Sequence, residues 1–338
     1  MNENDAKELF SIGKYNEAFS MYEKLWNDSS ENDIWVGWGL ARTLNKLKKY
    51  DQSLVVCKKV LELKSDFNYI RSVYIQAAYL SKIKDYNFDN SYEVLEQYIK
   101  RIININSDNK TDLFFNLSLI KIMEYSSKNK MWDMVIKWGE LINIEELNNK
   151  PFITDNKIYI ASDKESWFLK ISQAFEKKNL WDECIVNSRK GLSLFKDSPQ
   201  SIWLKIRIAI SEYYIESKEK GIESLINCYS IKKDWFIAHK IGQLFSENNN
   251  INMAEKYFVE ACIKTQKKPD FGVKLYEDLS IFYESKKDIE MSKKYLSLTL
   301  IIREENGWKI NENLMIKAKK LHIELNIEKK EILKDLKN

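Results

Sequence analysis

Basic and aromatic side chains are the residues of this chain best suited to binding chemistry. The most regular set is the basic series Lys121, Lys170, Arg207 and Lys240, which recurs through the middle of the chain. Cations beside aromatic faces can hold an acidic peptide through carboxylate pairing and cation–π contact. They can equally hold a single-stranded nucleic acid through phosphate contacts and base stacking. The further candidates are Arg42, Lys46, Trp35, Trp38, Tyr79, Trp203, Tyr213, Phe236 and His239.

A plainer interpretation stands beside this one. A lysine-rich chain places lysines on every solvated face, and aromatic residues fill the contacts between helices. His239 could bind a ligand or sense pH, or it could be an ordinary surface histidine.

The sequence offers no catalytic constellation. It lacks GxxxxGK[ST] and GxGxxG, so no nucleotide-binding loop is predicted. It also lacks GxSxG and HExxH. His239 and His322 are the only histidines, and no Cys or His pair has metal-ligand spacing. We therefore predict a protein that is not an enzyme and uses neither a metal nor another cofactor.

Composition favours a helical chain with short connections. Only 3 prolines and 9 glycines occur in 338 residues, and 44% of the residues are hydrophobic. The net charge of +4 permits an acidic partner without demanding one. A polar N-terminus, the lack of a long apolar run and four scattered cysteines predict a cytoplasmic protein with buried thiols and no membrane contact.

The elements that must position these residues are clearest in residues 234–267, which predict two short amphipathic helices joined by a turn. Small residues let the two helices approach, and large ones fill the gap between them. A second signal is the run GKYNEA at residues 13–18. Both stretches resemble the tetratricopeptide repeat (TPR) family, whose period is about 34 residues. The key places in residues 234–267 are Ile241, Gly242, Phe245, Ala254, Phe258 and Ala261.

About eight such repeats span residues 2–304. The resemblance implies an all-α fold, a right-handed α-solenoid of TPR-like helix hairpins, and residues 311–325 predict a C-terminal capping helix. We expect repeats one to four in residues 1–144 and repeats five to eight in 164–304. Residues 145–163 interrupt the period as an inserted loop or small hairpin, and 305–338 form the capping helix and a charged tail.

In the family, first helices line a concave groove that binds peptides or protein tails, and members are rarely catalytic. The resemblance thus implies a scaffold or adaptor whose partly basic groove holds a protein segment, with the candidates above in that groove. Residues 161–310 also resemble the repeat region of bacterial proteins that join such repeats to a cold-shock domain. That resemblance implies an alternative, an accessory of a defence or mobile-element system that contacts nucleic acid directly or through a partner. A peptide-sensing regulator is a second alternative.

Overall fold

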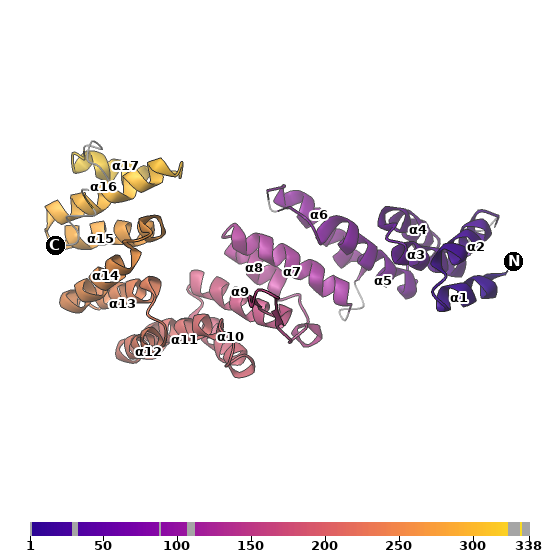
Figure 1. Ribbon diagram of the computed structural model, residues 1–338, viewed down its shortest axis with the longest axis horizontal. Helices are drawn as coiled ribbons and strands as arrows, with labels where there is room; N and C mark the ends of the chain where they lie inside the picture. The colour runs from indigo at the N-terminus through magenta and orange to yellow at the C-terminus, as the bar shows by residue number, and fades with distance from the viewer. Residues whose placement is uncertain (1, 29–32, 88, 107–111, 324–331, 333–338) are drawn as a thin grey trace. The chain divides into compact units, whose positions relative to one another are not determined.

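A computed structural model describes residues 2–28, 33–87, 89–106, 112–323 and 332 (Figure 1). Helices make up nearly all of the regular structure in these residues. The chain divides into two compact units, Met1–Asn187 and Ser188–Asn338. Among the described residues, no helix is both long enough and apolar enough to cross a membrane.

The first unit is a row of antiparallel helices in which successive helices from α1 to α9 pack against one another along the chain. Helix α10 (Trp181–Leu194) begins in this unit and ends in the second. The other helices of the first unit are α1 (Glu3–Ser11), α2 (Tyr15–Asp28), α3 (Ile34–Lys46), α4 (Tyr50–Leu63), α5 (Asn68–Ala78), α6 (Tyr92–Ile105), α7 (Leu113–Lys128), α8 (Trp132–Gly139) and α9 (Asp163–Lys177).

The second unit continues the same order of packing. Its remaining helices are α11 (Ser201–Ile215), α12 (Lys218–Ile231), α13 (Trp235–Glu247), α14 (Ile251–Thr265), α15 (Val273–Ser285), α16 (Ile289–Glu305) and α17 (Glu312–Lys320), with a 3-10 turn, η3 (Pro269–Gly272), before α15. Helices α1 to α16 thus form eight successive pairs among the described residues. The predicted all-α solenoid of TPR-like hairpins is confirmed.

Small residues on the second helix of each pair let it approach the first helix. Ser53, Cys184 and Ser292 stand where the family usually has alanine, and each has no exposed surface. Each also hydrogen bonds to a carbonyl of the first helix: Ser53 Oγ to Ala41 O at 3.0 Å, Cys184 Sγ to Ser172 O at 3.4 Å, and Ser292 Oγ to Ser280 O at 2.8 Å. Serine or cysteine in place of the usual alanine therefore keeps the two helices close and adds a hydrogen bond between them.

The turn inside a pair places one residue in the left-handed backbone region. Gly13 occupies this position in the first pair with φ of 81°. Five other pairs place a side-chain-bearing residue there, at a steric cost that glycine avoids. These residues are Lys48, Lys130, Asn179, Asn249 and Lys287.

The third pair departs from this pattern. Helix α5 runs directly into a π-helical turn, η1 (Tyr79–Ile83), before the connection to α6. A π turn inserts an extra residue into the helical ladder. The connection to α6 therefore follows a helix that is itself irregular.

Residues 145–163 contain a short β-hairpin, so the structure has the second of the two alternatives stated above. Strands β1 (Phe152–Ile153) and β2 (Tyr159–Ile160) are antiparallel, and a 3-10 turn, η2 (Ile144–Glu146), precedes them. Tyr159 Oη donates to Glu165 Oε2 at 2.5 Å, and Lys164 Nζ lies 3.0 Å from Glu145 Oε2. These contacts anchor the hairpin to the start of α9. The boundaries proposed for two sub-arrays on either side of it stay a prediction.

Helix α17 covers the last pair in the way a capping helix should. Its Leu314 and the following Leu321 pack with Leu296 and Leu300 of α16 in one buried cluster. The final pair would otherwise leave this apolar surface open. Apart from residue 332, the predicted charged tail at residues 326–338 lies outside the described residues.

Candidate functional site

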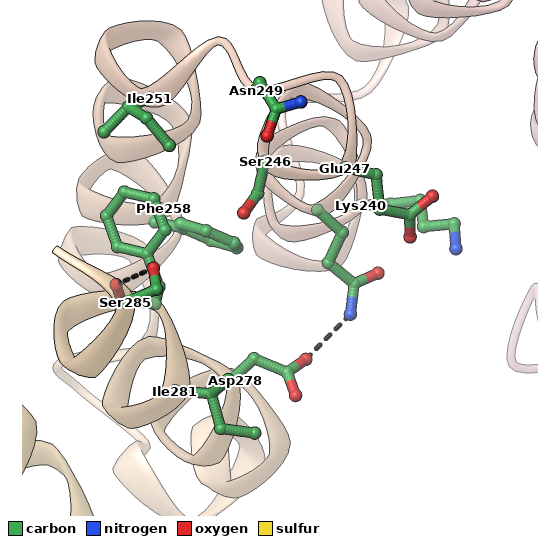
Figure 2. Close-up of a pocket in the computed structure, with 11 residues that line it drawn as sticks. Lys240, Ser246, Glu247, Asn249, Ile251, Phe258, Asp278, Ile281 and Ser285 are labelled. Atoms are coloured by element: carbon green, nitrogen blue, oxygen red, sulfur yellow. Dashed lines mark hydrogen bonds between the residues drawn. The ribbon is translucent and has the colours of Figure 1, made fainter.

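A cavity of about 510 Å³ in the second unit lies between α13, α14 and α15 (Figure 2). Both first helices of the last two pairs contribute to its walls. Helix α13 supplies Lys240, Gln243 and Glu247, and α15 supplies Asp278 and Ile281. The cavity therefore combines hydrogen-bonding groups of both kinds with apolar surface. The other lining residues are Ser246, Asn249, Ile251, Phe258, Phe282 and Ser285.

Close approach of α13 and α14 forms the back of the cavity. A Cβ atom on Gly242 would lie only 2.7 Å from Phe258 Cδ1, closer than real side chains come. The absence of that side chain lets the Phe258 ring lie against the backbone of α13. Phe258 also contacts Phe282 of α15, with ring centroids 5.1 Å apart. The apolar side of the cavity is thus fixed by packing between all three helices.

Asp278 organises the polar side. Its Oδ2 lies 2.8 Å from His239 Nε2 and accepts a hydrogen bond from Gln243 Nε2 at 2.7 Å, while its Oδ1 lies 2.8 Å from Lys274 Nζ. Burial alone would raise the pKa of Asp278. The hydrogen bonds from His239 and Lys274 outweigh burial and hold its pKa below the ordinary value of 3.8. Asp278 is therefore an anchor between two successive pairs.

Glu247 is hydrogen bonded to the preceding helix pair. Tyr214 Oη of α11 donates to Glu247 Oε2 at 2.8 Å. Glu247, Asp278 and Lys240 all line the cavity. The charge of this site is consequently mixed rather than basic.

The structure places the other candidates of the second unit outside the lining of this cavity. Of the set predicted there, only Lys240 lines the cavity. Arg207 is buried, with 6% of its surface exposed, and Tyr213 is buried with its hydroxyl 3.2 Å from Leu244 O. His239 is also buried, stacks on Trp235 and contacts Asp278, so it is not the ordinary surface histidine that stood as its alternative.

Trp203 and Phe236 lie at the starts of α11 and α13. Their rings stack with centroids 4.6 Å apart and an interplanar angle of 17°. The Nζ atom of Lys232 lies 5.9 Å from the Trp203 ring and 5.7 Å from the Phe236 ring. These two candidates therefore form a partly exposed aromatic pair with a lysine beside it.

In the first unit, the predicted cations differ in their surroundings. Lys170 Nζ lies 3.4 Å from Glu124 Oε1, so a carboxylate offsets its charge. Lys121 is half-buried on the same helix as Glu124. Tyr79 lies in the π turn with its ring 5.7 Å from Phe114. These residues do not form a continuous positive surface.

The remaining candidates gather in the second pair. Trp35, Trp38, Arg42 and Lys46 follow one another along α3 at helical spacing. The Trp35 and Trp38 rings lie 5.9 Å apart, and the Arg42 guanidinium lies 4.3 Å from the Trp38 ring. The structure therefore places these four candidates together on one helix.

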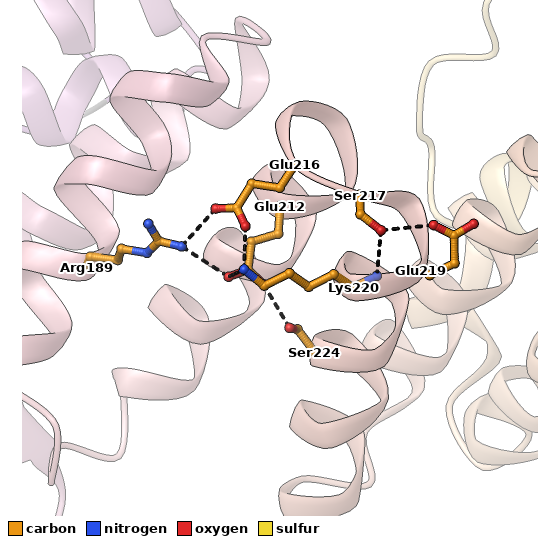
Figure 3. Close-up of polar contacts among 7 residues, drawn as sticks. All are labelled: Arg189, Glu212, Glu216, Ser217, Glu219, Lys220 and Ser224. Carbon is orange, nitrogen blue, oxygen red and sulfur yellow. Dashed lines mark hydrogen bonds and ion pairs between the residues drawn. The ribbon is translucent and has the colours of Figure 1, made fainter.

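A separate charge network joins α10, α11 and α12 in the second unit (Figure 3). Arg189 lies 3.1 Å from both Glu212 Oε1 and Glu216 Oε1, and Lys220 pairs with the same two carboxylates. Ser224 Oγ donates to Glu212 Oε2 at 2.8 Å. Because its charges satisfy one another, this network links helices and presents no unbalanced charge.

Gln243, Asp278 and Ile281 line the cavity and were not predicted. Asp278 carried a signal, because it occupies in the eighth repeat the place that Lys240 occupies in the seventh. A carboxylate at that place ends the basic series and does not by itself indicate a cavity. Its contact with His239, 39 residues earlier, is visible only when the two helices lie side by side.

Comparison with known proteins agrees with this architecture. The model of the tetratricopeptide repeat protein 21 C-terminal ARM domain matches residues 11–78. No curated protein sequence matches the chain. This match covers only part of the chain. Together with the repeating helix pairs, it agrees with an all-α solenoid of TPR-like hairpins.

Solved structures show a looser likeness. The structure titled "Human IFIT1 dimer with PPP-AAAA" has 16% sequence identity and a TM-score of 0.45, and the match covers 94% of this chain and 72% of that chain. YrrB, titled a TPR protein with an unusual peptide-binding site, has 13% identity and a TM-score of 0.35 over 68% of this chain and 100% of its own. MamA has 15% identity and a TM-score of 0.35 over 58% and 96%. At these TM-scores the likenesses carry no argument about function.

Proposed function

We propose that this chain is a non-catalytic scaffold that holds an extended protein segment against the first helices of its repeats, at the cavity between α13 and α15. The observation that carries the proposal is the lining of that cavity. Lys240 and Gln243 offer donors, Glu247 and Asp278 offer acceptors, and Ile281 offers exposed apolar surface at 54%.

An extended peptide suits this lining for two reasons. Every peptide unit carries one donor and one acceptor, so a wall with both kinds of group can satisfy a bound backbone. The volume of about 510 Å³ also falls in the range of ordinary ligand pockets, and Ile281 and Phe258 provide an apolar contact for a side chain. The proposed ligand is therefore a short segment with at least one apolar side chain.

The alternative of direct nucleic-acid contact has less support at this cavity. A groove that follows a phosphate backbone needs predominantly positive walls. Here two carboxylates, Glu247 and Asp278, accompany Lys240. These two carboxylates would repel phosphate groups, whereas they would not repel a peptide backbone.

A peptide-selection experiment tests the proposal. The purified chain is used to select binders from a random short-peptide library, and the dissociation constants of the selected peptides are measured by fluorescence anisotropy. We expect Ile281→Asp to weaken binding about tenfold or more, because it places a charge where an apolar side chain docks. Ile231→Asp is the matched control, since Ile231 is 67% exposed on α12 and does not line the cavity.

The outcomes separate clearly. Loss of binding in Ile281→Asp with retention in Ile231→Asp supports the proposal. Equal binding by wild type and Ile281→Asp, or no selected peptide at all, refutes it. Circular dichroism of both variants checks that the helices are retained.

A further inference from the structure

An exposed aromatic cluster lies on the first unit, in repeats separate from the cavity. Trp35 contacts Trp38, Phe67 and Tyr69 with ring centroids 5.9, 4.9 and 5.4 Å away. Phe67 is buried, but Trp35 is 41% exposed and Tyr69 is 59% exposed. A contiguous exposed apolar patch, unlike a single exposed residue, is a mark of a binding surface. The outer face of the cluster is therefore available for a ligand.

Arg42 extends this cluster along α3. Its guanidinium carbon lies 4.3 Å from the Trp38 ring centroid and 4.5 Å from that of Phe10 on α1. Contact with two rings restrains a flexible side chain, and a stacked guanidinium keeps its N–H groups available at its edge. The side chain is thus positioned in advance for an anion.

Arg42 and Lys46 also differ from other cations of the first unit. Lys7, Lys82 and Lys170 pair with carboxylates at 2.7, 2.7 and 3.4 Å, respectively. Among the residues that the structure describes, no carboxylate forms an ion pair with Arg42 or with Lys46, one helical turn further on. The two cations therefore carry charge that the described part of this unit does not neutralise.

We propose that Trp35, Trp38, Tyr69, Arg42 and Lys46 form an anion–aromatic subsite for an acidic peptide segment with an aromatic side chain beside its carboxylates. Arg42 receives one carboxylate through two N–H groups, Lys46 receives a second, and the aromatic side chain packs on Trp35 and Tyr69. This subsite rests on the proposed scaffold function, but it lies on the other unit and takes a ligand of defined charge.

Charge complementarity favours a peptide over a nucleic acid. Two cations match a segment with two carboxylates. A single strand of nucleic acid needs a positive track for successive phosphates. Lys82 and Lys170 are each paired with a carboxylate, so these two cations do not extend the positive charge of Arg42 and Lys46.

The test uses defined probes and the full chain. A fluorescein-labelled peptide, Gly-Ser-Glu-Phe-Glu-Ser-Gly, is titrated with wild-type protein and followed by anisotropy, beside a matched peptide with Gln in place of both Glu and a short labelled oligo(dT). We expect saturable binding of the acidic peptide only. Arg42→Gln and Lys46→Gln should each weaken it by about tenfold or more, as expected when a charge-assisted hydrogen bond is lost.

Two further variants sharpen the result. Arg42→Lys keeps the charge but removes the planar fork, so it should weaken binding nearly as much as Arg42→Gln. Lys58→Gln removes one exposed charge from α4 of the same pair and should leave binding unchanged. Unchanged binding in both Arg42→Gln and Lys46→Gln overturns the proposal. Absence of saturable binding up to about 1 mM, equal binding of the Gln peptide, or preference for oligo(dT) also overturns it.

These results do not depend on Ile281 or the cavity of the second unit. Failure of the acidic probe alongside a positive peptide selection would remove the subsite and leave the scaffold proposal standing. The reverse pattern would remove the cavity and retain the subsite.

Discussion

Replacement of Asp278 by Asn should weaken the junction between the last two repeat pairs. Asp278 receives His239 and Gln243 from α13 and Lys274 from its own helix, at 2.7–2.8 Å. Asn has nearly the same volume and can still accept one hydrogen bond, so packing is preserved while the charge is lost. The variant thus isolates the electrostatic part of the junction.

The expected cost follows from these contacts. A hydrogen bond to a charged group contributes about 1.5–3 kcal/mol. The Lys274 side chain is 63% exposed, so solvent screens its contribution and we assign it little weight. The expected cost therefore comes from the buried contacts of Asp278 to His239 and Gln243. An asparagine at this position can still accept one of these hydrogen bonds, so part of the cost is recovered. We expect a loss of about 2 kcal/mol, equivalent to roughly 4–8 °C in the melting temperature of a unit of this size.

The pH dependence has a definite sign. Because folding lowers the pKa of Asp278 below 3.8, its stabilising contribution is complete above that unfolded value. It declines as the pH falls through the lower folded pKa. The difference in stability between wild type and Asp278→Asn should therefore shrink as the pH falls below about 4.

Urea unfolding followed by circular dichroism, with hydrogen exchange of α13 and α15, measures this difference. Asp197→Asn is the control, because Asp197 is exposed in the same unit. A change within about 0.5 kcal/mol for Asp278→Asn at pH 7 would refute the argument. So would a loss that leaves exchange at α15 unchanged while destabilising distant helices.

Two other predictions concern the repeat frame itself. Lys287→Gly should stabilise the protein by about 0.5–1 kcal/mol in the same urea assay, because glycine relieves the left-handed backbone at φ of 63°; a destabilised variant would contradict this. Cys57 and Cys262 should react with a thiol reagent at pH 8 at least about a hundredfold more slowly than a free thiol, and regain normal rates in urea. Burial raises both pKa values to about 12, so rapid labelling of the folded chain would show that these helices are not packed as described.

The repeat architecture was predictable because its determinants are local. Close approach of two helices requires a small residue at one place of the second helix, and Ala18, Ser53 and Ala254 recur there with no exposed surface. The sequence alone showed that these places accept small residues. It did not show why serine is acceptable, since the bond from Ser53 to the Ala41 carbonyl depends on the distance between the two helices.

The hairpin at residues 145–163 marks an intermediate case. Alternation of apolar residues around Asp155 and Asn156 permitted either a hairpin or a loop. Strands of two residues give too few ladder bonds to be distinguished by pattern. The deciding contact joins Tyr159 to Glu165, and Glu165 belongs to the next helix.

The charge of the groove could not be predicted, because it is a property of neighbouring repeats taken together. Its position within the repeat placed Lys170 in the basic series, but the carboxylate of Glu124 on the preceding first helix offsets its charge. Their repeat positions also predicted Arg207 and His239 in the groove. Both side chains are buried, and His239 contacts Asp278.

Arg42 shows the converse. It lies outside the basic series, yet stacking on Trp38 and Phe10 restrains it where the described part of its unit supplies no paired carboxylate. A cation in a repeat array therefore becomes a binding group when its neighbours fix its orientation without neutralising it. By that criterion we expect the second pair, rather than the regular basic series, to be the stronger anion-binding site of the described chain.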